Sequence, residues 1–219
     1  MLRRTSTVLL ASGLTALLNV STPASQIPGR VIEPVVVDLA ANGFSLTSVE
    51  DGVRFDLDLD GVPDEVGWTA RGSDDAFLAM DRTQSGSVAA PHLLFGGMPP
   101  GVNGFDTLGQ FENDPMQWLR SPTPLKTGPE PPGIVDESDP VFHRLILWVD
   151  ANHNGLSEAD EMRSPQSVGL VQISSGYEGT SEREQHGNLF RYKAKVLVKN
   201  AHGVPVYSEA RAVRFVIKR

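Results

Sequence analysis

The chain has 219 residues and a formal net charge of −8, and hydrophobic residues make up 40% of it. This length fits one domain with long loops, and this composition excludes a wholly disordered chain. The chain contains no cysteine, which excludes disulfide bonds and lipid attachment at a cysteine.

The first 25 residues have the pattern of a secretory signal peptide. Arg3 and Arg4 precede an apolar run at residues 8–18, and the small residues Thr22 and Ala24 suit a cleavage site. The run is short for a membrane span, although an uncleaved N-terminal anchor is an open alternative. Cleavage would remove two positive charges and take the net charge from −8 to −10. We therefore expect a secreted or periplasmic protein that attracts cations and binds neither nucleic acid nor, after cleavage, a membrane.

Residues 26–49 are predicted to be a lead-in, and residues 50–219 to be the folded domain. An apolar, β-branched run at residues 30–39 predicts a first strand. Pro34 predicts that this strand lies at a sheet edge, because proline lacks the N–H that a ladder needs. Alternating apolar residues at 43–80 then predict a β-meander.

An acidic loop interrupts this meander at residues 56–64. Acids stand at its positions 1, 3, 5 and 9, and Gly61 at position 6 supplies a sharp turn. Calcium prefers six to eight oxygen ligands, and four carboxylates so close together repel one another unless a divalent cation neutralises them. The predicted calcium ligands are Asp56, Asp58, Asp60, Asp64 and the backbone carbonyl of Val62.

The middle of the chain predicts one helix and one long irregular segment. A helix is expected at residues 104–119, with Leu108, Phe111 and Leu119 on its buried face. Prolines predict a loop at residues 121–133. Degenerate versions of the acidic loop occur at residues 81–92 and 133–139, and they retain too few hard oxygens for us to expect metal there.

The second half predicts a helix, several strands and a hairpin. Asp139 and the proline after it are typical of a helix start, and an apolar run that ends at Asp150 predicts a buried strand. Residues 167–174 alternate as a strand, and residues 190–198 and 204–217 predict a hairpin. The predicted fold class is α+β, mostly antiparallel strands and hairpins with two or three short helices and inserted calcium loops.

The second acidic loop, residues 150–161, fits a twelve-residue calcium-binding pattern without a mismatch. Its predicted ligands are Asp150, Asn152, Asn154, the backbone carbonyl of Leu156 and the bidentate carboxylate of Glu161. Asparagine at positions 3 and 5 predicts a weak structural site, with a dissociation constant of about 10⁻⁴–10⁻³ M. Ser157 stands at position 8, where an aliphatic residue usually pairs two loops, so we expect an unpaired loop. A solvated acidic turn is the alternative interpretation of either loop.

Several segments occur in the order of one known family: residues 55–68, 74–81, 94–96, 103–105, 139–142, 147–158 and 188–196. Together they resemble a secreted bacterial EF-hand-like domain that is also found within large RTX-type and adhesin-like proteins. The resemblance implies calcium binding by up to four loops, with ligands at the positions given above. It assigns no enzymatic activity.

These observations predict a non-catalytic calcium-binding module with Ca²⁺ as its cofactor and an unidentified protein or cell-surface partner. The five histidines are scattered and form no H-E-x-x-H or Cys/His motif, and no nucleophile elbow or phosphate loop occurs, so we predict no catalytic and no other cofactor-binding residue. A secreted hydrolase with an unrecognised site remains an alternative. So does an FG-GAP or propeller-like adhesion fragment, although propellers need repeats and the loop at 56–64 occurs once. Trp68 and Trp148 are predicted to lie in the core.

Overall fold

The computed structural model describes residues 31–82, 87–97, 102–113 and 133–218. The described strands, in chain order, are β1 (Val35–Asp38), β2 (Val53–Phe55), β3 (Asp64–Val66), β4 (Asp75–Ala79), β5 (Ile134–Asp136), β6 (Ile146–Trp148), β7 (Met162–Arg163), β8 (Leu170–Ser174), β9 (Glu178–Gly179), β10 (Leu189–Lys199), β11 (Pro205–Arg214) and β12 (Ile217–Lys218). The helix α1 (Gly104–Asn113) and three short 3₁₀ turns, Pro91–Leu93, Phe142–Arg144 and Gln166–Val168, complete the described elements. The predicted signal peptide and the proline-rich segment up to residue 132 lie outside these ranges.

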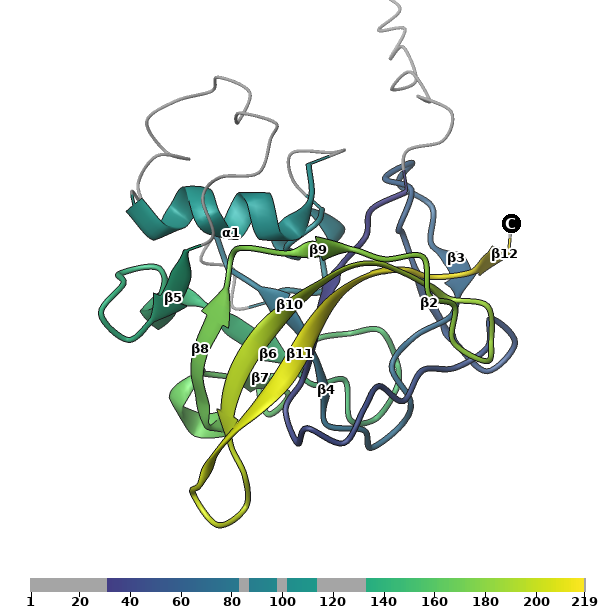
Figure 1. Cartoon of the computed structure of the whole chain (residues 1–219). Helices are drawn as coiled ribbons and strands as arrows, with labels where there is room; N and C mark the ends of the chain where they lie inside the picture. Colours follow the sequence, from purple (N-terminus) through teal and green to yellow (C-terminus); the bar gives the residue numbers. More distant parts are fainter. Residues whose placement is uncertain (1–30, 83–86, 98–101, 114–132, 219) are drawn as a thin grey trace, which may run out of the picture.

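The strands form two sheets in which every pairing is antiparallel. The larger sheet has the order β5-β8-β10-β11-β1-β4-β6-β7, and β9 pairs with β10. It is strongly curved, and the long β10–β11 hairpin extends beyond its neighbours (Figure 1). The smaller sheet has the order β12-β3-β2. The predicted C-terminal hairpin is confirmed, since residues 189–199 pair with residues 205–214.

The predicted α+β class is wrong, because the described chain is mostly antiparallel β-structure with one α-helix. The helix predicted from Asp139 onward is reduced to the 3₁₀ turn Phe142–Arg144. Only one residue separates this turn from β6, which pairs with β4 in the larger sheet. Sheet pairing therefore overrides the local helix-start signal. The other predicted helix, at residues 104–119, forms as α1 over Gly104–Asn113, and its Leu108 and Phe111 are buried as expected. The remainder of that prediction, including Leu119, lies outside the described ranges.

β1 was predicted at a sheet edge and instead lies in the middle of the larger sheet, between β11 and β4. Pro34 directly precedes the strand, so its missing N–H removes no hydrogen bond from the ladder. All four residues of β1 are buried. A strand that is buried on both faces has apolar residues at successive positions, and the sequence of this segment shows that pattern.

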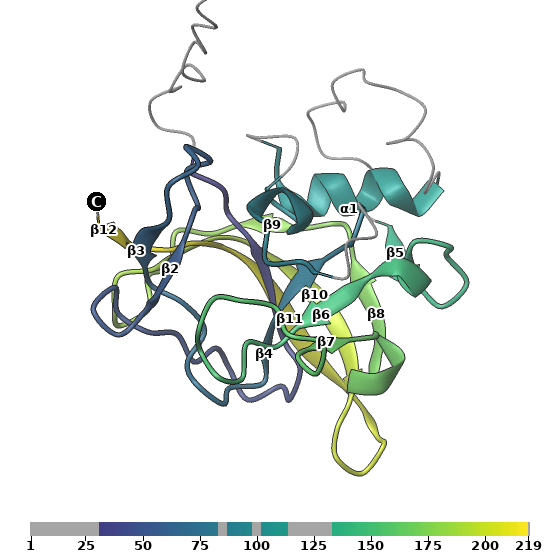
Figure 2. The same cartoon turned by 180° about the vertical axis from the view of Figure 1, so that it is seen from behind.

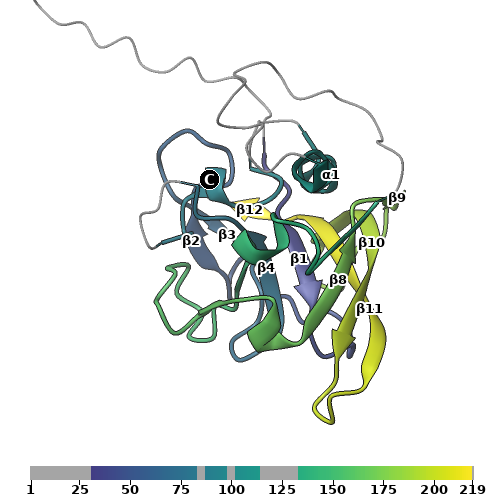
Figure 3. The same cartoon turned by 90° about the vertical axis from the view of Figure 1, so that its left-hand side faces the viewer.

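Two hydrophobic clusters cover the two faces of the central strands. Val35 and Val37 belong to the cluster that contains the residues of α1, whereas Val36 belongs to the cluster that contains β2 and β3. Figure 3 shows α1 and the smaller sheet on different sides of β1 and β4. Trp68 and Trp148 are fully buried in the second cluster, which confirms their prediction as core residues. No helix in the described ranges has the length and apolarity needed to cross a membrane.

Candidate metal centre

The first acidic loop connects β2 to β3, and three of its carboxylates converge. One oxygen each from Asp56, Asp58 and Asp60 lies within 4.8 Å of the others. Oxygens bound to one calcium ion at 2.3–2.6 Å are separated by about 5 Å at most, so this spacing fits a shared ion. Leu57, between the first two acids, is fully buried, which fixes the face on which the acids emerge. Asp64 is outside this group of three and begins β3, opposite Phe55.

Backbone amides of the loop donate to the acids at positions 1 and 5. Asp56 Oδ1 accepts the N–H of Asp60 at 3.1 Å, and Asp56 Oδ2 accepts the N–H of Gly61 at 3.0 Å. Asp60 Oδ1 in turn accepts the N–H of Val62 at 2.8 Å. The chain is thus wrapped around its own first carboxylate.

The second loop connects β6 to β7 and repeats this network position by position. Asp150 accepts the N–H groups of Asn154 and Gly155 at 3.0 and 2.8 Å, one on each oxygen. Asn154 Oδ1 accepts the N–H of Leu156 at 2.7 Å. Positions 1, 5, 6 and 7 therefore have the same partners in two loops that share no strand.

The backbone conformations of the two loops agree as well. Gly61 and Gly155, at position 6, have φ values of +88° and +72°. Leu59 and His153, at position 4, are two of only three non-glycine residues with positive φ in the described chain, each at +61°. This conformation is uncommon for any residue other than glycine. Its occurrence at the same position in both loops indicates that the loop frame requires it.

The ends of the second loop are buried against indole groups. Asp150 and Glu161 are only 2% and 4% exposed. Trp68 Nε1 donates to Asp150 at 2.8 Å, and Trp148 Nε1 donates to Glu161 at 3.3 Å. The two indoles lie in an aromatic cluster with Phe55, whose ring is 4.9 Å from Trp68. Since Phe55 directly precedes Asp56, this cluster connects the two loops.

Glu161 also faces a second carboxylate of its own loop. Burial and a hydrogen bond with Glu158 raise the pKa of Glu161 above its usual range, while the side-chain amide of Asn154 lowers the pKa of Glu158. The two carboxyl groups therefore titrate as an interacting pair, in which Glu161 holds its proton more tightly than Glu158 does. A cation at this position would take the place of that proton. At position 3, the side chain of Asn152 is exposed, and the backbone N–H of Asn152 donates to Glu161 at 3.3 Å.

The expectation that the second loop is unpaired is wrong. Ser157 Oγ accepts the N–H groups of Val88 and Ala89 at 2.9 and 3.1 Å. Val88 is at position 8 of the degenerate loop at residues 81–92, as Ser157 is in the second loop. The residues at position 8 of these two loops are therefore in contact, through the hydroxyl of Ser157. Residues 83–86 of that degenerate loop lie outside the described ranges.

His153 ties the second loop to two other segments, which the sequence analysis missed. Its Nδ1 and Nε2 each lie 2.7 Å from a carbonyl oxygen, of Thr69 and Asp51 respectively. Figure 2 shows this loop extending from β6 and β7 toward β2 and β3. Nothing in the local sequence marks His153 for this contact, because both partners are distant in the chain.

The degenerate loop at residues 133–139 forms a local turn. Asp139 Oδ2 accepts the N–H of Asp136 at 2.9 Å. Asp136 Oδ1 accepts both the N–H and the hydroxyl of Ser138, and these two bonds lower the pKa of Asp136. The turn explains the acids here without a metal ion.

Comparison with known proteins places these loops within a named domain. The family model of the SPM domain matches residues 35–119 and 129–207, which include both acidic loops. The iron-regulated protein FrpA of Neisseria meningitidis serogroup C is 22% identical to the chain over 167 residues. The aligned region is 73% of this chain and 13% of FrpA, so the chain corresponds to a small part of that relative.

Proposed function

The chain belongs to the SPM domain family, and we propose that it is an exported, non-catalytic module whose two acidic loops bind calcium. The observation that carries the proposal is the repeated loop frame. Asp56 and Asp150 each accept the amides of positions 5 and 6, and positions 4 and 6 have positive φ in both loops. Such a frame directs the side chains of positions 1, 3 and 5 toward one point, as EF-hand loops do.

The donor sets of the two loops suit calcium. They consist of carboxylate, amide and carbonyl oxygens, which are the ligands that a hard cation of this size prefers. In the first loop three carboxylates approach within 4.8 Å of one another, and their mutual repulsion is relieved by a divalent ion. The negative charge of the chain favours cations over nucleic acid and over anionic lipid.

The proposed role of the ions is structural. The chain has no disulfide bond, and binding to the folded state alone adds to the free energy of unfolding. At free calcium about ten times above the dissociation constant, each site contributes about 1.4 kcal/mol. Two sites then contribute about 3 kcal/mol, which raises the melting temperature by about 5–10 °C for a domain of this size.

Thermal unfolding of the chain in millimolar CaCl₂ and in EDTA tests the proposal. We expect the melting temperature to be lower in EDTA than in CaCl₂. This difference in melting temperature should be smaller in Asp58→Ala and in Asp150→Ala than in the unaltered protein. Glu50→Gln, which changes an exposed acid outside both loops, is the control and should retain it. Equal melting temperatures in both buffers, with no heat of calcium binding in calorimetry, would contradict the proposal.

Tryptophan fluorescence distinguishes the two loops. The indoles of Trp68 and Trp148 donate to Asp150 and Glu161, so calcium in the second loop alters their surroundings directly. We expect a calcium-dependent emission change that Glu161→Gln abolishes and Asp58→Asn largely preserves. A change that depends equally on both variants would mean that the loops do not bind independently.

A further inference from the structure

A third group of acids, outside both loops, lies at the junction of two central strands. Asp38 ends β1 and Asp75 begins β4, and the two residues are direct partners in the antiparallel ladder. Asp74 precedes Asp75 in the turn that leads into β4. One oxygen from each of the three carboxylates lies within 4.8 Å of the others. Like charges directly opposite each other on paired strands destabilise a sheet, so this arrangement needs compensation.

The described part of the chain supplies no positive charge to balance these acids. Asp38 and Asp75 are only 4% and 1% exposed, and no lysine, arginine or histidine in the described ranges forms an ion pair with the three acids. Asp75 Oδ1 is buried and has no hydrogen-bond partner among the described residues. Burial raises the pKa of Asp75 to about 7; the charges of Asp74 and Asp38 add to this rise, and the Ser45 N–H and the Ser73 hydroxyl oppose it. A buried oxygen without a partner costs free energy unless a ligand binds it.

The neighbouring loop holds the carboxylates in place. Gly43 N donates to Asp38 Oδ2 at 2.8 Å, Ala40 N donates to Asp74 Oδ2 at 2.7 Å, and Ser45 N donates to Asp75 Oδ2 at 2.8 Å. Each carboxylate oxygen can accept a second interaction, so these backbone amides orient the acids and still leave lone pairs that can bind a cation. Amide donors also favour the ionised form, which is the form that binds a cation.

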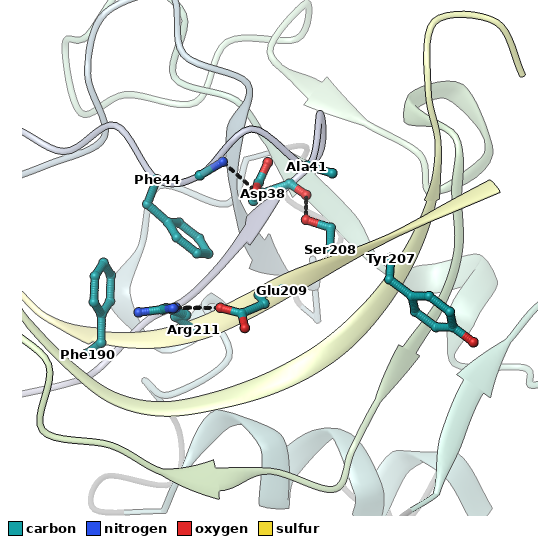
Figure 4. Close-up of a pocket in the computed structure, with 9 residues that line it drawn as sticks. Asp38, Ala41, Phe44, Phe190, Tyr207, Ser208, Glu209 and Arg211 are labelled. Carbon is teal, nitrogen blue, oxygen red and sulfur yellow. Dashed lines mark hydrogen bonds and ion pairs between the residues drawn. The ribbon is translucent and has the colours of Figure 1, made fainter. Parts of the chain in front are cut away.

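The group has a path to solvent. Asp38 lines a surface cavity of about 380 Å³, together with Gly43, Phe44 and Ser208. Figure 4 shows the Asp38 carboxylate at this cavity, with the Ser208 hydroxyl bonded to the Asp38 carbonyl at 2.7 Å. An ion can therefore reach the acids from outside without opening the sheet.

We propose that Asp38, Asp74 and Asp75 bind a third divalent cation, of the calcium type, which fastens the loop at residues 39–45 to the central strands. Three carboxylates, from β1, from β4 and from the turn before β4, provide the hard oxygens that calcium prefers, within the span that one ion requires. Water from the cavity completes the coordination. This site does not depend on the two loops, since it shares no residue with either.

Counting bound ions on the full chain tests the site. Equilibrium dialysis against calcium, followed by metal analysis, should give one ion fewer per chain for Asp75→Asn and for Asp74→Asn than for the unaltered protein. Glu50→Gln is the matched control and should leave the count unchanged. Circular dichroism establishes that each variant is folded, and Asp74, which is half-buried, serves if Asp75→Asn does not fold.

The outcomes separate this site from the loops. An unchanged count in both folded variants overturns the third site and leaves the proposal for the two loops unaffected. Loss of one ion per chain in Asp75→Asn or Asp74→Asn supports the third site. A count of zero for the unaltered protein overturns both proposals.

Manganese provides a test that needs no substitution. Mn²⁺ at the site should broaden the amide resonances of Gly43 and Ser45, whose N–H groups bond Asp38 and Asp75. The amide of Gly203, in the distant β10–β11 turn, should stay sharp at the same manganese concentration. Equal broadening of all three resonances would overturn the proposal.

Discussion

The two acidic loops have the same internal frame and very different surroundings. In the first loop, Asp56 and Asp58 are half-exposed and Asp60 is exposed, and the loop lies at the end of a sheet of three short strands. In the second loop, the first and last of the proposed ligand residues, Asp150 and Glu161, are buried and accept hydrogen bonds from two tryptophans. The hydrogen bonds to the residues at positions 1 and 5 join the same loop positions in both loops, whereas the contacts that the loops make with the rest of the molecule differ.

The comparison shows that the local sequence pattern determines the conformation of each loop, whereas the fold determines the surroundings of the loop. The local pattern of acids and glycine fixes the wrapping of each loop around its first carboxylate. The fold decides how many of its polar groups are buried, and therefore how much a lost contact costs. We expect the first loop to depend mainly on the ion and the second to be a structural part of the core even without it.

The largest expected difference follows from removing the first ligand of each loop. Asp150 accepts three buried or half-buried donors, so Asp150→Ala should destabilise the ion-free protein by about 3–5 kcal/mol. Asp56 accepts two donors at the surface, and Asp56→Ala should cost about 1 kcal/mol. Urea unfolding in EDTA measures both values. Similar costs would show that burial does not distinguish the loops.

Substituting the glycine at position 6 should also destabilise the protein more in the second loop than in the first, by a smaller amount. Both glycines have positive φ, so alanine costs about 1–2 kcal/mol at either position. A Cβ on Gly155 would also lie 3.2 Å from the carbonyl oxygen of Arg54 and 3.2 Å from a Val53 methyl group, whereas a Cβ on Gly61 meets nothing within 4 Å. We expect Gly155→Ala to cost about 1 kcal/mol more than Gly61→Ala in chemical denaturation. If Gly61→Ala proved the more damaging, the packing of the second loop on β2 would be in question.

Ser157 tests the contact between the second loop and residues 87–89. Ser157→Ala leaves the N–H groups of Val88 and Ala89 without their acceptor, and should cost about 1–2 kcal/mol. Ser181→Ala, at an exposed serine, is the matched control and should change stability by less than about 0.5 kcal/mol. Equal stabilities for the two variants would mean that solvent replaces the serine hydroxyl at no cost.

Local signals predicted the parts of the fold that local chemistry controls. The hairpin of β10 and β11, the helix α1 and the burial of Trp68 and Trp148 all follow from side-chain periodicity and apolar content. The second helix failed because a distant strand, β4, pairs with β6 directly after the predicted helix start. The edge position of β1 failed because Pro34 stands just outside the strand, where it blocks nothing.

Of the candidate site, the positions of the two loops could be predicted from the sequence, but the contacts around them could not. The spacing of acids and glycines marked both loops, because each is wrapped by its own amides. Its environment was not predictable, since Trp68 meets Asp150 across 82 residues and Ser157 meets Val88 across 69. The acids Asp38, Asp74 and Asp75 were missed for the same reason, because only the register of β1 against β4 brings them together.

A reciprocal exchange at position 3 gives the smallest effect and the most direct comparison of the two donor sets. Asp58 in the first loop corresponds to Asn152 in the second. Asn152→Asp adds a charge to the second set and should tighten calcium binding there, while Asp58→Asn should weaken the first loop; each change is about 1 kcal/mol, or roughly fivefold in dissociation constant. Calorimetry on each variant, with the other loop disabled by Asp56→Ala or Glu161→Gln, measures the two constants separately.

The exchange also tests whether charge or burial sets the affinity. If the number of carboxylates dominates, the two variants should approach each other's affinity, because the frames are the same. If the buried closure by Glu161 dominates, Asn152→Asp should change little, since the amide of residue 152 already donates to Glu161 and an added carboxylate would repel it. An Asn152→Asp variant that binds calcium no more tightly than the parent would therefore show that the tryptophan-covered end of the loop, and not its exposed acids, controls the second site.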